Sequence, residues 1–300
     1  KRGDLETILK LFVQFGAPEN ILYDAHPHIG TNKLPQIITA MRQAILDSGG
    51  KFLFEEQVDK LVIKDNTLLE VGTSNGGTFS ADAYILATGH SARDIFELLY
   101  KEKILIEAKP FALGVRVEHP QKLIDSIQYN LPVLKETDSF RPPYLPPASY
   151  SLVQQWNNRG VFSFCMCPGG IIAPAATDPG ELVVNGWSPS KRNNKFANSG
   201  MVVQVEKEDA FIWLNKFYPE WELTSEHPLL MMKFQQAVEQ RAFDAGGGNF
   251  VAPAQRLVDF VKNKVSVDLP ENSYLPGLKP SLLSEVLPNF IYQALADSFK

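Results

Sequence analysis

A run of four apolar residues that ends in a threonine and a glycine constrains the fold of this chain more than any other stretch. The run covers residues 84–87, Thr88 and Gly89 follow it, and a polar segment then opens a predicted helix. Apolar residues without alternation are typical of a strand that is buried on both faces of a parallel sheet. Open α/β sheets bind ligands at the carboxyl ends of such strands. The stretch therefore predicts an α/β fold with a site near Gly89.

Shorter strand-like runs before this stretch predict a small β-meander. The predicted strands lie at residues 51–54, 58–63, 68–73 and 78–81. The connections at residues 64–67 (KDNT) and 74–77 (SNGG) have the composition of tight turns. We predict that the meander is inserted just before a strand that re-enters a parallel sheet.

Five segments, spread over nearly all 300 residues, together carry a family resemblance. They are residues 27–34 (PHIGTNKL), 87–94 (ATGHSARD), 109–120 (KPFALGVRVEHP), 164–170 (FCMCPGG), and 246–248 (GGG) with 252–256 (APAQR). A meander followed by a strand that ends in Ala-Thr-Gly is similar to the flavoproteins with two dinucleotide-binding domains. More narrowly, the chain resembles the central part of a family of bacterial FAD-dependent dehydrogenases, also described as NAD(FAD)-utilising dehydrogenases. The resemblance implies FAD as cofactor and allows NAD(P) as a second one.

The resemblance also implies parts that this sequence lacks. A flavoprotein of this class begins with a strand and a Gly-x-Gly-x-x-Gly turn, which receives the pyrophosphate at a helix N-terminus. No Gly-x-Gly-x-x-Gly occurs in the sequence, and the family's C-terminal Gly-rich turn is also missing. We therefore expect a central portion of a longer enzyme, which lacks part of the FAD site and is inactive by itself.

Composition argues against several classes of protein. A formal net charge of −5 gives no basic surface for nucleic acid and no polybasic membrane signal. No apolar run approaches the roughly 20 residues that cross a bilayer. Two cysteines do not make a disulfide framework, which predicts a reducing compartment. We expect a cytoplasmic protein whose partner is a small-molecule substrate, with no nucleic acid and no membrane.

The segment before a helix that we predict at residues 34–45 is a candidate cofactor contact. His28, Gly30 and Thr31 precede a helix in which Pro35 would lie in the first turn. A helix N-terminus with a glycine just ahead of it can receive an anion or a ring carbonyl. The resemblance implies that this segment passes close to the cofactor. The alternative is a capped helix after a His-Pro-His turn.

The segment after the buried run is the second candidate contact. Its residues are Thr88, Gly89, His90 and Ser91. Gly89 lets the backbone approach a ligand closely, and Ser91 is a predicted N-cap. His90 and Arg93 are candidates to bind the cofactor's phosphates or an acidic substrate. The alternative for Arg93 is a surface ion pair with Asp94 or another carboxylate.

Val58, at the start of the meander, is the third candidate. The resemblance implies that its backbone N–H and C=O groups bind the adenine edge of FAD. Side-chain chemistry has no part in that role, so Val58 can equally be the first core residue of its strand.

An alternating strand at residues 113–119 supplies candidates for substrate binding. Apolar side chains would share one face, while Arg116 and Glu118 would share the other. Arg116 can hold a carboxylate through two hydrogen bonds, and His119 is a candidate for proton handling. The alternative is the wet face of an antiparallel sheet.

Cys165 and Cys167 lie at i and i+2, which predicts that both side chains point to the same side of a strand. They are candidates for a strained redox pair or for contact with a flavin-linked substrate, because the thiolate is the reactive species. The alternative is that they are small buried apolar residues. No second cysteine pair is present and the histidines are scattered, so we predict no metal site.

The predicted fold is α/β with two domains. Residues 1–107 would carry the remainder of a FAD-binding domain with a parallel sheet and the meander, and residues 108–300 a mixed, mostly antiparallel α+β substrate domain. A loop at residues 138–147 is long enough for a lid or a dimer arm, which allows a homodimer.

The expected function is transfer of a hydride between a small-molecule substrate and flavin. Arg116, His119, Cys165 and Cys167 are the residues expected to bind the substrate or handle protons. The alternatives are a flavin monooxygenase, a reductase of unsaturated acids, and a module that binds a small molecule or a partner chain without catalysis.

Overall fold

The computed structural model describes residues 4–131 and 141–300. Part of the predicted lid or dimer arm, residues 138–140, lies outside these ranges. Among the described residues, no helix combines the length and the apolarity that a membrane span requires.

The chain begins with two helices joined by a short 3-10 helix. These elements are α1 (Leu5–Gln14), η1 (Glu19–Leu22) and α2 (Leu34–Asp47). The Asp4 side chain caps α1 by accepting a hydrogen bond from the Thr7 N–H. Ile21 and Ile37 form a small core with Ala17. The apolar residues Ile21 and Leu22 belong to η1 and not to a strand.

The predicted meander is confirmed. It consists of β1 (Val58–Lys64), β2 (Thr67–Thr73) and β3 (Thr78–Phe79), paired antiparallel in that order. Asp65 and Asn66 connect β1 to β2 with positive φ angles of 50° and 59°. Such a pair of left-handed residues matches the twist of a two-residue hairpin, and Asp and Asn tolerate it better than most residues.

The predicted buried strand at residues 84–87 is not formed. Ile85 is 92% exposed and Leu86 is 62% exposed, and no strand pairs with them. The strand predicted at residues 51–54 is likewise absent, with Phe54 69% exposed. A strand needs neighbours that satisfy its backbone N–H and C=O groups, whatever its composition. The described residues therefore do not form the predicted parallel sheet.

The largest sheet is antiparallel, as predicted for the second part of the chain. Its strands, in spatial order, are β4 (Phe111–Pro120), β9 (Phe196–Val205), β6 (Arg159–Cys167) and β5 (Val153–Trp156). β4 and β9 pair without a register shift from Phe111 opposite Val205 to Pro120 opposite Phe196. A second antiparallel pair, β7 (Ile171–Pro174) with β8 (Val184–Trp187), contacts β9 and the neighbouring strands. The one parallel pair in the described chain is short, β10 (Ala252–Ala254) with β11 (Leu278–Pro280).

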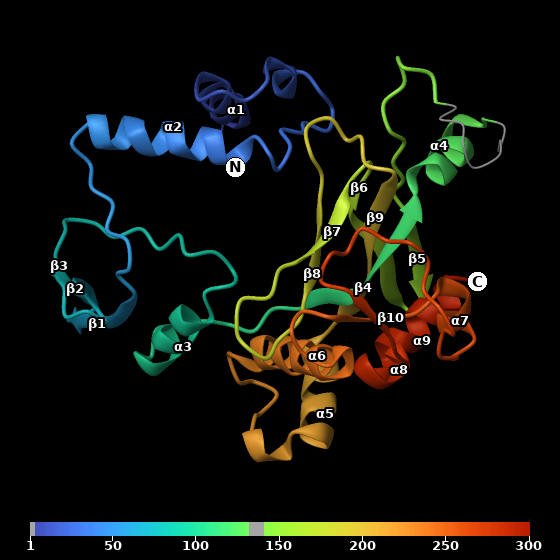
Figure 1. Ribbon diagram of the computed structural model, residues 1–300. Coiled ribbons are helices and arrows are strands. Elements are labelled where there is room, and N and C mark those ends of the chain that lie inside the picture. Colours follow the sequence, from blue (N-terminus) through green and yellow to red (C-terminus); the bar gives the residue numbers. More distant parts are fainter. Residues whose placement is uncertain (1–3, 132–140) are drawn as a thin grey trace.

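Helices cover one face of this sheet (Figure 1). They are α5 (Lys207–Phe217), α6 (Leu230–Gly246), α7 (Leu257–Val261), α8 (Leu283–Val286) and α9 (Asn289–Ser298), with the 3-10 helix η2 (Pro219–Trp221) after α5. The core lies between these helices and the sheet, where Val203, Phe234, Ile291 and Leu295 are fully buried. Leu113, Val115 and Val117 pack against this core. The predicted alternation of β4 is confirmed, because Arg116 and Glu118 then lie on the opposite face.

Two further helices join the parts of the chain. α4 (Gln121–Tyr129) follows β4 directly, and α3 (Arg93–Lys101) packs against the meander through Ile95 and Leu98. In Figure 1 the meander and α3 lie to one side of the large sheet, and α1 and α2 lie above them.

Arg93 anchors α3 to the second part of the chain. Its side chain donates hydrogen bonds to Glu181 and, at 2.6 Å, to Oε2 of Glu239, and Asp178 lies 3.4 Å away. Arg93 is only 9% exposed. The alternative prediction, an ion pair with a carboxylate other than Asp94, is therefore confirmed, although the pair is buried and not at the surface. Burial inside a cluster of carboxylates gives it a structural role instead.

Candidate functional site

Arg116 lies at the centre of a polar cluster on the face of the sheet opposite the helical core. It occupies the middle of β4, opposite Gly200 of β9. Its Nη1 donates to Asn198 Oδ1 at 2.6 Å and to the Cys165 carbonyl at 3.3 Å, and its Nη2 donates to Asn185 Oδ1 at 3.2 Å. Residues from β6, β8 and β9 thus hold the guanidinium in one orientation.

A β-bulge determines which cysteine side chain joins this cluster. Phe164 pairs with Gly200, but the next pair is Cys167 with Asn198, so β6 carries one extra residue. Regular pairing would place Cys167 opposite Ala197, on the other face of the sheet. The bulge instead places Cys167 on the face of Arg116. It also interrupts the alternation from which we predicted that both cysteines share one side.

The two cysteines have different surroundings. Cys165 is exposed, has a φ of 46°, and contributes its backbone carbonyl to Arg116. Cys167 is half-buried, and its Sγ lies 3.4 Å from the same carbonyl. Both thiols are free. Their chemistry therefore differs, since one is open to solvent and the other is enclosed beside a cation.

Gly186 of β8 covers the cluster closely. A Cβ atom added at this position would lie 2.3 Å from Arg116 Nη1, 2.4 Å from Asn198 Oδ1 and 2.8 Å from Cys167 Sγ. Side-chain atoms of three strands thus converge on one point of the β8 backbone. Only glycine fits there, because any side chain would displace at least one of these groups.

Burial and charge act in opposite directions on this cluster. Burial raises the pKa of the Cys167 thiol, and the nearby guanidinium groups of Arg116 and Arg192 oppose that shift. Burial also lowers the pKa of Arg116. The thiol of Cys167 is therefore protonated at neutral pH, while Arg116 keeps its charge because a guanidinium starts from a very high pKa.

His119 lies on the other face of β4, where it is opposite Ala197. Its Nε2 is 2.9 Å from the Tyr150 hydroxyl, and burial lowers the pKa of His119. Burial raises the pKa of Tyr150, which Ser199 and Arg116 oppose. Of the four residues predicted to handle substrate or protons, the structure thus brings Arg116, Cys165 and Cys167 together and places His119 apart from them.

The predicted cofactor segment around Gly30 is bound to a loop of the same chain. Thr31 donates through its N–H and its hydroxyl to the Ser188 carbonyl, at 3.1 and 3.3 Å. His28 Nε2 lies 3.3 Å from the Pro189 carbonyl. A Cβ added to Gly30 would lie 2.4 Å from the Ser190 nitrogen. Any contact of these groups with a cofactor therefore requires these hydrogen bonds to be exchanged.

The other predicted cofactor residues are the exposed segment at residues 88–91 and the partly buried Val58. Thr88, Gly89, His90 and Ser91 are all exposed. Gly89 has a φ of 77°, and no atom lies within 4 Å of a Cβ added to it. Val58 is opposite Thr73, next to a register shift, and packs against α3. Within the described ranges, no hydrogen bond joins residues 88–91 to residues 28–31. The exposed segment at residues 88–91 is accessible, but the predicted cofactor residues do not enclose a common site.

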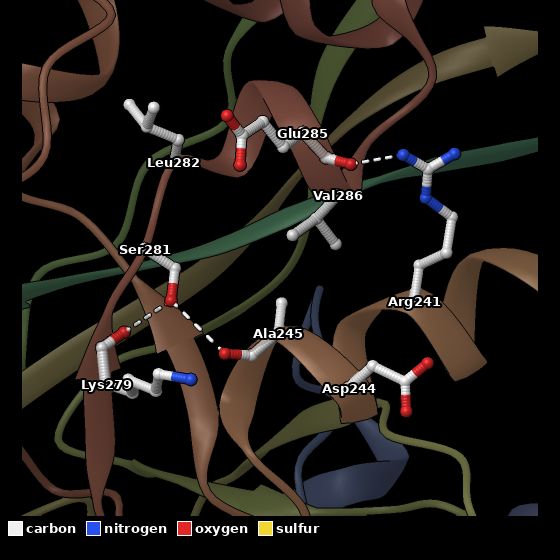
Figure 2. Close-up of a pocket in the computed structure, with 8 residues that line it drawn as sticks. All are labelled: Arg241, Asp244, Ala245, Lys279, Ser281, Leu282, Glu285 and Val286. Atoms are coloured by element: carbon white, nitrogen blue, oxygen red, sulfur yellow. Dashed lines mark hydrogen bonds between the residues drawn. The ribbon is translucent and has the colours of Figure 1, made fainter.

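A pocket of about 430 Å³ lies away from all these residues (Figure 2). It is lined by residues of α6, β11 and α8 and of the loop between them: Arg241, Asp244, Ala245, Lys279, Ser281, Leu282, Glu285 and Val286. Arg241 donates to the Glu285 carbonyl and stacks over the rings of Trp213 and Phe217. None of the predicted site residues lines this pocket, so we place the candidate site at Arg116.

Sequence reasoning missed several members of the site. Asn198 and Gly186 are not among the residues predicted above, and no strand is predicted above for residues 196–200 (FANSG). Asn, Ser and Gly are depleted in strands, which hides β9 at this end. The available signal was the polar pair Asn198 and Ser199, which precedes most of the apolar residues of β9. Among the described residues, no group of three or more His, Cys, Asp or Glu side chains is placed to hold a metal ion.

Comparisons with known proteins place these observations in a family. Residues 110–300 match the family model described as "FAD-dependent protein, C-terminal domain-like". A protein of Clostridium beijerinckii (strain ATCC 51743 / NCIMB 8052), named only "Uncharacterized protein", is 38% identical to this chain over 294 residues. The aligned region is 97% of this chain and 51% of that protein. The chain thus spans about half the length of the curated relative that it matches.

Proposed function

The chain belongs to the family of FAD-dependent proteins whose C-terminal domain is matched by residues 110–300, and on this basis we propose that it is part of a FAD-dependent oxidoreductase. The reaction that we propose is a dehydrogenation, in which a hydride passes between a small-molecule substrate and flavin. The observation that carries this proposal is the cluster of Arg116, Asn198 and Cys167 beneath Gly186. It is a fixed, charged and partly enclosed group on the face of the sheet that the core leaves free.

When bound, the flavin supplies the atom that gives or takes the hydride. The residues of this chain would bind and orient the substrate beside it. Arg116 is held by Asn198 and Asn185 and keeps a positive charge, so it is suited to fix an anionic group. Burial raises the pKa of Cys167, so the thiol beside Arg116 carries its proton at neutral pH. His119 with Tyr150 is a proton-handling pair.

The cofactor contacts that we propose use the exposed segment at residues 88–91 and the start of the meander. Gly89 lets a ligand approach the backbone. Val58 forms the first residue pair of the meander, with Thr73, and lies next to α3. Gly30, Thr31 and His28 would join them only after releasing the loop at residues 188–190. NAD(P) is the proposed electron partner of the longer protein.

Absorbance spectroscopy tests the proposal. The C. beijerinckii relative and this chain are each incubated with FAD and desalted, and the flavin absorption is measured. We expect the relative to retain flavin. Its flavin should bleach anaerobically when NADH or NADPH is added, or when a reducing substrate from a panel of small acids is added. A relative that retains no flavin would contradict the proposal.

The second candidate is a binding module without catalysis. It is favoured by one observation, that within the chain Thr31 is already hydrogen-bonded to Ser188 and Gly30 already lies against Ser190. A flavin monooxygenase and a reductase of unsaturated acids are alternatives of the same enzyme class. Two results together would favour the monooxygenase. NADH or NADPH would reduce the flavin in the absence of substrate, and the reduced flavin would then consume oxygen and substrate together.

A further inference from the structure

Two buried hydrogen-bond donors next to Cys167 have no partner. In the described part of the chain, the buried side-chain polar atoms without a hydrogen bond are Arg192 Nε, Asn198 Nδ2 and Ser298 Oγ. Asn198 is 0% exposed and lies opposite Cys167 across β6 and β9. Arg192 is close enough to Cys167 that its charge lowers the pKa of the thiol. Two of the three unpartnered atoms thus belong to one small region.

An unpartnered buried donor is costly, since native proteins satisfy nearly all such groups. The Oδ1 atom of Asn198 already accepts from Arg116, which fixes the amide with its NH2 group turned away from that guanidinium. The remaining donor capacity of Asn198 is therefore held in a defined direction. It requires an acceptor that the described residues do not supply.

The same region carries positive charge. Neither Arg116 nor Arg192 forms an ion pair with a described residue, although the charge of Asp24 partly opposes the lowering of the Arg192 pKa that burial causes. The carboxylate on the same face of β4, Glu118, is bonded to the N–H and hydroxyl of Ser273 instead. Asn185 and Cys165, which flank Arg116, are both exposed, so the cluster borders solvent, whereas Asn198 Nδ2 and Arg192 Nε are themselves buried.

We propose that Arg116, Arg192 and Asn198 form a subsite for the carboxylate of a small organic acid, next to the thiol of Cys167. A carboxylate offers two oxygens with about four acceptor positions, which matches two guanidinium groups and one amide. The identification of this acid as the substrate rests on the proposed function. Binding of the acid itself requires no flavin and is testable without it.

Alkylation of Cys167 tests the subsite directly. The probes are iodoacetate, which carries a carboxylate next to its reactive carbon, and the uncharged iodoacetamide. In both reactions the thiolate forms an S–C bond, iodide leaves, and the thiol proton passes to solvent. The reactions are followed by mass spectrometry in the variant Cys165→Ser, which leaves one thiol. We expect iodoacetate to react about tenfold faster than iodoacetamide, the factor that one charge-assisted hydrogen bond supplies.

Competition and variants complete the experiment. Succinate should slow the reaction with iodoacetate, whereas succinamide should not. Arg116→Gln, Arg192→Gln and Asn198→Asp should each remove the preference for iodoacetate. Lys195→Gln should leave it unchanged, because Lys195 lies in the same loop as Arg192 but pairs with Glu271 at the surface. Cys167→Ser gives the reference preference of the exposed Cys165.

Several results would overturn the proposal. One is a faster reaction of Cys167 with iodoacetamide than with iodoacetate. Another is no competition by succinate, and a third is a preference that survives both Arg116→Gln and Arg192→Gln. If Arg116→Gln does not fold by circular dichroism, Arg192→Gln and the competition on the unaltered chain decide the question. Flavin retention is measured separately, so failure of the subsite and failure of the flavoenzyme proposal are distinguishable.

Discussion

Arg93 is a single residue on which the joining of two parts of the molecule depends. Replacing it by methionine keeps most of the volume but leaves Glu181 and Glu239 buried without their cation. Because an uncompensated buried charge is costly, we expect Arg93→Met to lower the free energy of unfolding by about 3–5 kcal/mol. Urea denaturation followed by circular dichroism measures this loss.

A surface ion pair provides the matched control for Arg93. Lys195 pairs with Glu271, and both side chains are mostly exposed. Lys195→Met should change the free energy of unfolding by less than about 1 kcal/mol. Equal losses for the two variants would mean that Arg93 does not hold the parts together in solution.

Glu239 gives the stability of the protein a dependence on pH. Burial raises the pKa of Glu239, and the hydrogen bonds from Gln235 and Arg93 only partly oppose it. Between the ordinary value of 4.5 and the raised value, the folded state therefore binds more protons than the unfolded state. The stabilisation is full below pH 4.5 and is lost as the pH rises through the raised pKa.

The variant Glu239→Gln isolates this effect, because glutamine resembles the protonated side chain and does not titrate. We expect the free energy of unfolding of Glu239→Gln, relative to the unaltered protein, to rise from about pH 4 to about pH 8. Urea denaturation at a series of pH values measures the difference. A difference that stays constant, or that falls with pH, would contradict the assignment.

At the scale of the elements, the approach of β8 to the cluster gives a sharp prediction. A Cβ at Gly186 would lie closer than 3 Å to atoms of Arg116, Asn198 and Cys167. We expect Gly186→Ala to displace Arg116, to remove the preference of Cys167 for iodoacetate, and to lower the free energy of unfolding by about 1–3 kcal/mol. Urea denaturation and the alkylation assay measure both effects.

Gly160, on β6, is the control for Gly186. The nearest atom to a Cβ added there is at 3.5 Å, an ordinary contact, so alanine fits without displacing a neighbour. Gly160→Ala should leave both the stability and the alkylation preference nearly unchanged. If Gly186→Ala behaves in the same way, β8 does not press on the cluster.

The elements also show where the sequence determines structure and where it does not. The alternation in β4 predicted the face of Arg116 correctly, because one face of that strand has to pack on the core. The bulge at Cys165 and Met166 was not predictable, since neither residue is typical of a turn. Within the bulge Cys165 has a φ of 46°, a left-handed conformation that cysteine rarely adopts and that its sequence does not announce.

At the scale of the whole molecule, the N-terminal third exposes apolar segments that the sequence predicted as buried strands. Ile85 and Leu86 have no neighbouring strand, whereas β9 pairs on both sides. We expect hydrogen exchange, followed by mass spectrometry, to show no protection of amides at residues 84–87 and strong protection in β9. Equal protection of the two regions would contradict the arrangement described here.

Contacts between distant parts of the chain explain most of what the sequence could not predict. The meander and the helices were predictable, because turns, caps and periodicity are local. Arg93 forms ion pairs with Glu181 and Glu239, and Gly30 lies against Ser190. These residues are far apart in the sequence, so no local pattern predicts the contacts. The missing parallel sheet has the same cause, since a strand forms only where another strand is available to pair with it.

The bulge in β6 determines on which face of the sheet the second cysteine side chain lies. In a regular strand the side chains alternate between the two faces, and a bulge shifts that alternation by one residue. A chain with the same Cys-Met-Cys letters but regular pairing after Phe164 would place its second cysteine opposite Ala197, with the thiol on the face away from Arg116. Two proteins can therefore share this motif letter for letter and differ in whether they possess the site at all.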